Sequence, residues 1–383
     1  MSTYTFRHVD ALLKRFVDQG LPGCSCSVVR RGETVYEGFA GYADLATRRP
    51  IGPDTIFRLF SMTKVITCTA ALMLYERGFY LLNDPLSEYL SEFRHPSVYR
   101  QGENGTLYTS PAVAPIQVKH LFMMASGLTM YGDRTETERQ VSKLSLKEIP
   151  DLRSFAKRLA DIPLAFDPGT RWHYGFSHDM LGALIEVLSG KPFGQFLKEE
   201  IFEPLGMHDT FFRIPEDKKD RLTTLYAPSE EGPTPNMENE WLNRQDTTIE
   251  FGGHGLLSTL RDYGRFTQML ARGGELDGAR ILGRKTIELM ATDHLDARQR
   301  ADMALPGTWP GYGYGLGVRV MTDRAKGGSN STAGEFGWAG AAGSWMAADL
   351  EEELSVVYMQ GLLPKEYDEI RGHKLRAAIY SAL

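Results

Sequence analysis

Segments typical of β-strands occur only near the two ends of this chain, and this distribution strongly limits the folds that it can adopt. The candidate strands are rich in β-branched and aromatic residues and cover residues 24–30, 34–40, 314–321, 343–348 and 354–359. The first two are joined by the short turn Arg31-Gly32-Glu33, which is typical of a hairpin. Strands so far apart in sequence share a sheet only if the ends of the chain meet. We therefore expect one antiparallel sheet built from both ends.

Much of the remaining sequence has the apolar periodicity of α-helices. Such patterns, ended by Gly or Pro, cover residues 6–17, 61–78, 117–125, 152–160, 178–189, 193–201, 260–272 and 368–383. They predict an α+β fold in which terminal helices flank the antiparallel sheet and a mainly helical domain is inserted. We assign residues 1–80 and 245–383 to the α/β domain that contains the sheet, and residues 81–244 to the helical domain.

The boundary between these two domains is the expected place for an active site, because ligand sites favour domain junctions. Two polar loops, residues 103–115 and 230–244, are candidates for the rim of such a site, and both are equally compatible with plain surface loops.

Composition and charge argue against several classes of partner. The 383 residues include 43 Lys and Arg against 49 Asp and Glu, a formal net charge of −6, and contain no basic block. Nucleic acid is therefore not an expected partner. No apolar run approaches the roughly 18 residues of a membrane span, and the first residues lack the apolar core of a signal peptide. We expect a cytoplasmic protein with a small-molecule substrate and no membrane partner, and we leave its oligomeric state open.

Metal binding and disulfide bonds are not expected. The three cysteines are too few for a disulfide framework or a four-ligand zinc site: Cys24, Cys26 and Cys68. His173 and His178 are five residues apart and do not form the His-Glu-x-x-His pattern of zinc proteases. His254, between two glycines, is interpreted as a turn residue.

The tetrad Ser61-Met62-Thr63-Lys64 lies at the start of the apolar helical pattern that ends at Gly78. A lysine three residues after a serine lies one turn away on the same helical face, so its amine can accept the serine proton. Burial and the partial positive charge of a helix N-terminus both disfavour the ammonium form. Ser61 is therefore the candidate nucleophile and Lys64 the candidate base. The chain has no Gly-x-Ser-x-Gly pentad, which argues against an α/β-hydrolase.

Further motifs follow this tetrad in a specific order. They are residues 116–122 leading into Ser126-Gly127-Leu128, residues 166–170 before Trp172-His173-Tyr174, residues 201–207, and residues 252–259. With these motifs the chain resembles, over nearly its whole length, the serine β-lactamase and penicillin-binding-protein superfamily. It is most similar in pattern to class C β-lactamases and family VIII carboxylesterases. The resemblance implies the β-lactamase/transpeptidase-like fold and an acyl-enzyme formed on Ser61.

The second motif of this superfamily, Tyr-x-Asn, falls on Tyr174-Gly175-Phe176. The resemblance implies that Tyr174 shares a proton with Ser61 and Lys64 and later serves the leaving group. In β-lactamases and peptidases the Asn helps to hold the amide side chain of the substrate. Phe176 replaces it here, so we expect Phe176 to contact the substrate and we have one reason less to expect an amide or a lactam.

The third motif, Lys-Thr-Gly, falls on Trp338-Ala339-Gly340. The lysine supplies positive charge for a substrate carboxylate, whereas an indole offers one N–H donor and a large apolar face. Trp-x-Gly at this position is similar to the family VIII esterases, whose preferred substrates are short-chain esters. The resemblance implies that Trp338 and Gly340 bind substrate and that the backbone N–H groups of Ser61 and Ala341 form the oxyanion hole.

Together these features predict a serine hydrolase that cleaves small carboxylic esters through an acyl-enzyme and needs no cofactor. Three alternatives keep the same fold: an acyltransferase, a D-peptide or amide hydrolase, and a weak β-lactamase. A fourth, from another class, is a protein that captures an acyl ligand without turnover. The presence of Ser61, Lys64 and Tyr174 favours turnover.

Overall fold

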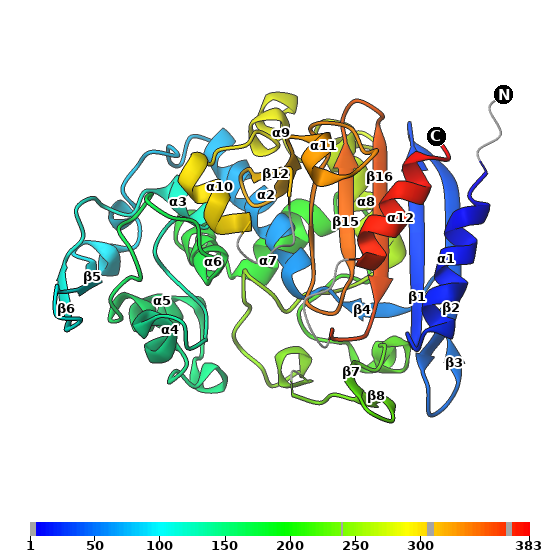
Figure 1. Ribbon diagram of the computed structural model, residues 1–383, viewed down its shortest axis with the longest axis horizontal. Helices are drawn as coiled ribbons and strands as arrows, with labels where there is room; N and C mark the ends of the chain where they lie inside the picture. The colour runs from blue at the N-terminus through cyan, green and yellow to red at the C-terminus, as the bar shows by residue number, and fades with distance from the viewer. Residues whose placement is uncertain (1–4, 239, 305–309, 365–369) are drawn as a thin grey trace.

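An eight-stranded sheet formed by both ends of the chain is the central element of the computed structural model (Figure 1). The structure describes residues 5–238, 240–304, 310–364 and 370–383. In sheet order the strands are β12 (Tyr312–Tyr314), β13 (Arg319–Met321), β14 (Phe336–Ala339), β15 (Trp345–Asp349), β16 (Leu354–Gln360), β1 (Gly23–Arg30), β2 (Glu33–Asp44) and β3 (Arg49–Pro50). All neighbouring strands are antiparallel. The predicted fold class is therefore confirmed.

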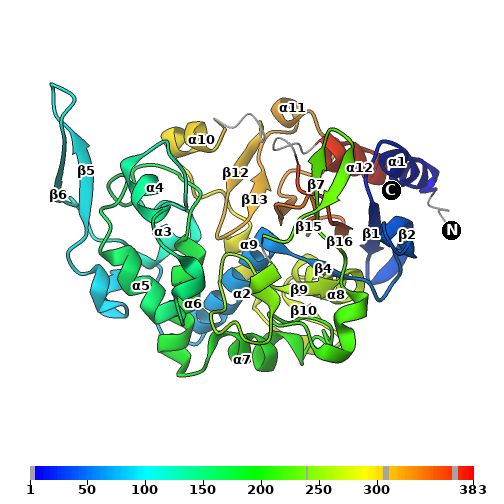
Figure 2. The same ribbon diagram turned by 90° about the horizontal axis from the view of Figure 1, so that it is seen from below.

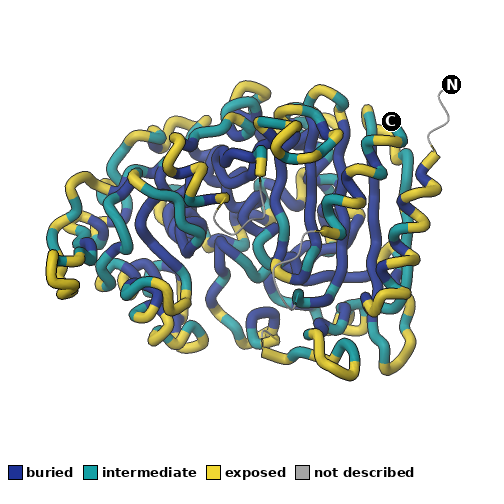
Figure 3. Tube along the Cα trace, in the orientation of Figure 1, coloured by how far each residue is buried: buried dark blue, intermediate teal, exposed yellow. Residues whose placement is uncertain are grey.

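Helices cover both faces of this sheet. Helices α1 (Arg7–Asp18) and α12 (Ile370–Tyr380) lie on one face and α8 (Leu260–Ala271) lies on the other (Figures 1 and 2). Side chains of β16 alternate between the two faces, as the pleat of a strand requires. Val356 and Tyr358 pack in the core below α1 and α12, and Val357 and Met359 pack in the core with α8. Strands β1 and β12 to β16 are buried along nearly all of their length, whereas β2 and β3 at one edge of the sheet are mostly half-buried or exposed (Figure 3).

Helix α2 (Thr63–Glu76) runs through the interior beside the sheet, and every residue from Thr63 to Leu74 is buried. It packs against α6 (Ser177–Ser189) and α7 (Phe193–Leu197). The other helices are α3 (Val118–Phe122), α4 (Glu136–Val141), α5 (Leu152–Ala160), α9 (Arg284–Met290), α10 (Ala297–Ala304) and α11 (Arg324–Gly327). Because α2 is enclosed on all sides, its apolar pattern is not confined to one face.

Four short strand pairs complete the structure. They are β4 (Ile56–Arg58) with β9 (Leu257–Thr259), β5 (Ser97–Gln101) with β6 (Leu107–Pro111), β7 (Tyr226–Ser229) with β8 (Gly232–Pro235), and β10 (Glu275–Leu276) with β11 (Ala279–Arg280). The β5–β6 hairpin extends away from the body of the molecule (Figure 2). Within the described residues, no helix has both the length and the apolar character needed to cross a membrane. The domain boundaries near residues 80 and 245 stay a prediction.

The structure corrects one expected strand. Residues 314–321 do not form a single strand, because a turn separates β12 from β13. Gly317 adopts a φ of 89°, and the N–H of Gly315 donates to the carbonyl of Val318 at 2.7 Å. A Cβ on Gly317 would lie 2.2 Å from the Cys68 Sγ, so the turn needs glycine for its close approach to α2.

Candidate active site

Ser61 lies in a single 3₁₀ turn, Phe60–Met62, between strand β4 and helix α2. The chain before this turn is fixed by the β4–β9 pair and by the Leu59 N–H, which donates to the Leu256 carbonyl at 2.9 Å. Phe60 has a φ of 47°, in the left-handed region that costs a residue with a side chain about 1 kcal/mol or more. The turn places Ser61 in the wall of a cavity at the start of α2.

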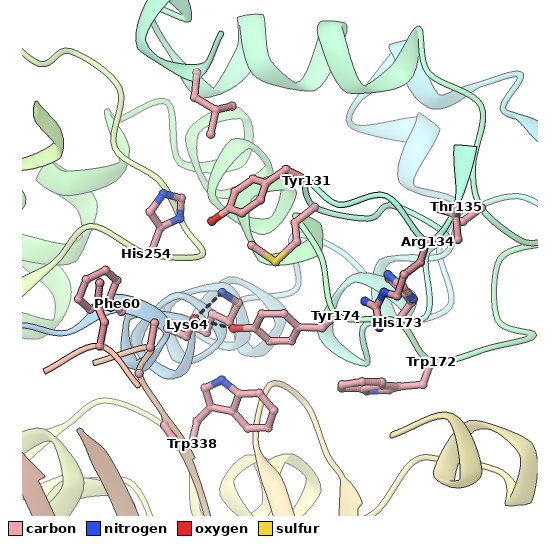
Figure 4. A pocket seen from close by; sticks show the side chains of 18 of the residues that line it. Phe60, Lys64, Tyr131, Arg134, Thr135, Trp172, His173, Tyr174, His254 and Trp338 are labelled. Carbon is pink, nitrogen blue, oxygen red and sulfur yellow. Dashed lines mark hydrogen bonds between the residues drawn. The ribbon is translucent and has the colours of Figure 1, made fainter. Parts of the chain in front are cut away.

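The predicted catalytic residues meet at the Ser61 hydroxyl. The Tyr174 hydroxyl donates to Ser61 Oγ at 2.6 Å, and Lys64 Nζ donates to the same oxygen at 3.2 Å (Figure 4). Lys64 is only 4% exposed, and its Nζ also donates to the Gly253 carbonyl at 2.6 Å. The ammonium lies 4.6 Å from the centroid of the Tyr174 ring, within cation–π range. The candidate nucleophile is therefore in contact with both candidate proton-transfer groups.

Tyr174 is held in place by aromatic packing on its other side. Its ring stacks on Trp338 with centroids 5.8 Å apart and an angle of 21° between the planes. Tyr314 in turn packs edge-on against Trp338 at 5.2 Å. The next residue, Gly175, has no space for a side chain, because a Cβ would lie 2.3 Å from the Leu128 carbonyl oxygen. This close packing fixes the direction of the phenol toward Ser61.

The end of strand β14 brings the third predicted motif to the nucleophile. A Cβ on Gly340 would lie 2.3 Å from the Leu59 carbonyl oxygen, so this position requires glycine. The close approach places residues 338–341 beside the turn that holds Ser61, and all of them line the same cavity. Trp338, Gly340 and Ala341 therefore line the same cavity as Ser61, and the oxyanion role of the Ala341 N–H stays a prediction.

Phe176 lies elsewhere than expected. It is 2% exposed and does not belong to the cavity wall, although we expected it to contact substrate. Its ring packs edge-on against Phe155 at 5.0 Å and against Tyr131 at 6.3 Å. Phe176 directly precedes α6, and its side chain turns into the helical core. Tyr131 lines the cavity in its place, so Phe176 supports the wall from behind.

The cavity has a volume of about 1170 Å³, which exceeds the space that a short ester needs. Its wall includes an apolar group of side chains: Phe60, Met130, Leu146, Phe166, Trp172, Trp241, Leu242, Met303 and Leu363. Of the two loops expected at the rim, residues 230–244 contribute three of the wall residues, and residues 103–115 contribute none among the described residues.

His254 is a cavity residue that the sequence interpretation missed. Its ring is half-buried and stacks on Phe251 with centroids 4.5 Å apart. Desolvation, and next the positive charge of Lys64, lower the pKa of His254 to about 3, so the imidazole is neutral at neutral pH. In the sequence, the only sign of this position is that His254 follows Gly253. The hydrogen bond between Gly253 and Lys64 could not be seen there, because the two residues are far apart along the chain.

An ion pair and two further polar contacts hold the segment that carries Tyr174 against the neighbouring helices. Arg171 donates twice to Asp302 of α10, at 2.5 and 2.6 Å, and the Trp172 N–H donates to the same carboxylate at 3.1 Å. His173 Nε2 lies 2.9 Å from Glu138 Oε1 of α4. Such pairs are not distinguishable from surface ion pairs in the sequence alone, because their partners are distant along the chain.

Cys68 and His178 form a second buried contact below the site, with Sγ and Nε2 3.6 Å apart. Burial raises the pKa of the Cys68 thiol well above its usual value, and burial together with the charge of Lys64 lowers the pKa of His178 to about 3. Both groups are therefore neutral, and the thiol is not an activated nucleophile. The described residues contain no group of three or more His, Cys, Asp or Glu that could hold a metal ion.

Comparisons with known proteins find relatives that match nearly the whole chain. Protein Rv1367c of Mycobacterium tuberculosis is 32% identical over 359 residues, which cover 91% of this chain and 88% of the relative. Esterase EstB of Burkholderia gladioli is 29% identical, and the match covers 95% of this chain and 92% of EstB.

A solved structure, EstCE1, described as a hydrolase with promiscuous acyltransferase activity, has a TM-score of 0.84 at 24% identity and covers 98% of both chains. That likeness concerns the fold. A sequence profile of the Beta-lactamase family matches residues 9–379. The chain therefore belongs to the Beta-lactamase family.

Proposed function

We propose that this protein is a serine esterase that hydrolyses carboxylic esters through an acyl-enzyme on Ser61. The observation that carries the proposal is the double contact at Ser61 Oγ, with the Tyr174 hydroxyl at 2.6 Å and Lys64 Nζ at 3.2 Å. A hydroxyl that is in contact with two proton-transfer groups can lose its proton as it attacks.

In acylation, Ser61 Oγ forms a bond to the carbonyl carbon of the ester, and its proton passes to the Lys64 and Tyr174 pair. The carbonyl oxygen becomes negative and is stabilised by the backbone N–H groups of Ser61 and Ala341. The C–O bond to the alcohol then breaks, and the pair returns the proton to the departing oxygen. Water repeats these steps in deacylation and releases the acid and the free Ser61.

The substrate is proposed to be neutral at its reacting end. Trp338, which is uncharged, stands where related β-lactamases have a lysine, and it lies in the cavity wall. The cavity of about 1170 Å³ also has space for acyl or alcohol groups larger than those of an acetate ester. We further propose that the protein acts in the cytoplasm on a small-molecule ester.

Acyl transfer to an alcohol is the second candidate. It is supported by the same cavity, which can hold a second organic group beside the acyl-enzyme, and by the promiscuous acyltransferase activity that is ascribed to the structural relative EstCE1. The chemistry differs only in which oxygen attacks the acyl-enzyme. Added alcohols would then compete with water for the same intermediate.

The test compares p-nitrophenyl acetate, butyrate and octanoate with nitrocefin, each with and without a primary alcohol. An esterase turns over the p-nitrophenyl esters by orders of magnitude better than nitrocefin, and an acyltransferase gives the new ester when alcohol is present. Purified, folded Ser61→Ala is expected to lose nearly all activity. If it retained more than a few per cent, the serine mechanism would be rejected.

A further inference from the structure

Asp179 is a buried carboxylate that the proposed mechanism leaves unused. It lies in the first turn of α6, five residues after Tyr174, and is 1% exposed. Its Oδ1 accepts a hydrogen bond from the Gly253 N–H at 2.9 Å, whereas no hydrogen-bond partner is described for the buried Oδ2. Burying a carboxylate without full pairing is costly. Its position beside the catalytic lysine suggests why the cost is tolerated.

Gly253 connects Asp179 to Lys64. Its N–H binds the carboxylate, and its carbonyl accepts from Lys64 Nζ at 2.6 Å. A Cβ on Gly253 would lie 2.6 Å from Asp179 Oδ2 and 3.2 Å from Lys64 Nζ. The unpaired oxygen and the amine therefore approach the same side of Gly253. Only a residue without a side chain lets both groups come this near.

The charges around Asp179 identify Lys64 as its main electrostatic partner. Desolvation raises the pKa of Asp179 to about 6, and the Lys64 charge is the largest of the opposing influences. Other titratable groups near Asp179 or Lys64 include His178 on the same helix, Tyr131, and His254 after Gly253. Both imidazoles are neutral at neutral pH because the pKa of each is about 3. Since neither imidazole is charged and a phenol is never a cation, the positive charge near the Asp179 carboxylate comes from Lys64.

We propose that Asp179 is a positioning residue for Lys64: it fixes the Gly253 carbonyl that orients the amine, and it supplies the buried negative charge that stabilises the ammonium form of Lys64. In a Ser-His-Asp triad the carboxylate has the same two tasks for the imidazole, which it orients and whose protonated form it stabilises. Here the orientation acts through the backbone of Gly253 rather than by direct contact. The inference rests on the proposed esterase function.

Asp179→Asn separates charge from shape, because the amide oxygen can still accept the Gly253 N–H. We expect kcat for p-nitrophenyl butyrate to fall about 10- to 100-fold, a part of the roughly 10²- to 10⁴-fold that general-base catalysis supplies. The KM is expected to change less than about threefold, because Asp179 does not line the cavity. The pH profile changes as well. Wild-type activity falls as the pH drops through about 6, where Asp179 takes up a proton, and the variant lacks this step.

Asp262→Asn is the matched control. Asp262 is also a buried carboxylate with a pKa raised by desolvation, and it accepts from the Asp209 N–H at 2.6 Å in another part of the fold. A purely structural effect of removing a buried charge would appear in both variants as a lower Tm. The fall in kcat and the loss of the step near pH 6 should appear only in Asp179→Asn.

Wild-type kcat and an unchanged pH profile in folded Asp179→Asn would overturn the inference. If Asp179→Asn does not fold, Gly253→Ala is the alternative test, because its methyl group would displace Lys64 or Asp179. Wild-type kcat in Gly253→Ala would also overturn the inference. Failure of the proposed function looks different. In that case the wild-type protein turns over none of the esters, or Ser61→Ala stays active.

Discussion

The indole of Trp338 lies stacked on the phenol of Tyr174, 5.8 Å away between ring centroids, and both side chains line the cavity. The residue that stands at the position of the lysine of related β-lactamases thus also supports the proposed catalytic side chain of Tyr174. Removing the indole therefore changes two properties, the charge of the cavity wall and the packing of Tyr174.

Two substitutions distinguish these properties. Trp338→Lys restores a cation and removes the stacking on Tyr174. We therefore expect kcat/KM for p-nitrophenyl butyrate to fall at least about tenfold. Relative to that ester, kcat/KM for nitrocefin should rise, because nitrocefin carries a carboxylate that the lysine can bind. Trp338→Phe keeps an aromatic ring and should retain most esterase activity. If Trp338→Lys shifts neither substrate, Trp338 does not face the substrate.

Lys64 and Tyr174 are expected to act as one unit, because both contact the same oxygen of Ser61. Lys64→Ala and Tyr174→Phe should each lower kcat strongly, by about 10²-fold or more. The double variant should be little worse than the poorer single variant, since groups that act together give non-additive losses. A double-mutant cycle on kcat measures this. Loss equal to the product of the single losses would argue against a shared proton path.

Phe176→Asn restores the residue that β-lactamases have at this position. Because Phe176 is 2% exposed among aromatic rings, we expect lower stability rather than a change of substrate. Removing a large buried ring costs about 3–5 kcal/mol, and the amide would need hydrogen-bond partners. Urea unfolding measures this loss, with Phe176→Leu as the milder control. A stable Asn variant with improved nitrocefin turnover would contradict the observed packing.

The burial of the His120 imidazole predicts that the folded protein loses stability in acid. Desolvation, with a smaller influence of Lys119, lowers the pKa of this buried imidazole to about 4. Below about pH 6.5 the unfolded chain binds a proton that the folded chain binds only near pH 4. The contribution of His120 is therefore complete above pH 6.5 and decreases as the pH falls, by about 2 kcal/mol at pH 5.

His120→Gln should remove this part of the pH dependence. His120 Nδ1 accepts the Gln117 N–H at 3.1 Å in a capping box, a role that glutamine also performs. Urea unfolding at pH 7.5 and pH 5 gives the change in unfolding free energy, and His8→Gln on the exposed face of α1 is the control. An equal pH dependence in both variants would mean that His120 is not the acid-sensitive group.

The parts of the site that the sequence predicted are those with fixed local spacing. Ser61 and Lys64 share one turn, so their contact follows from helix geometry, and Tyr174 and Trp338 were found through motifs of the superfamily. The direction in which the Phe176 side chain points could not be predicted from the sequence. Phe176 turns into the core because Phe155 and Tyr131 surround it there, and both are remote in sequence.

The fold was predictable to a similar extent. The strands at both ends have clear apolar patterns, whereas the break between β12 and β13 depends on the approach of Gly317 to Cys68. Asp179 and His254 were missed for the same reason, since each is connected to Lys64 through Gly253. Contacts of this kind leave no periodic signal in the sequence.

The pairing of β1 with β16, which aligns Cys24 with Gln360, joins the two ends of the chain that carry the candidate site. Ser61 follows β1 in the chain, whereas Trp338 lies in β14 and Ala341 lies just after it. The proposed oxyanion hole would therefore combine two distant parts of the chain. Joining such segments closes a very long loop, and sheets with remote pairings fold slowly. We therefore expect recovery of the proposed esterase activity after dilution from urea to follow the closure of the sheet rather than the formation of the helices.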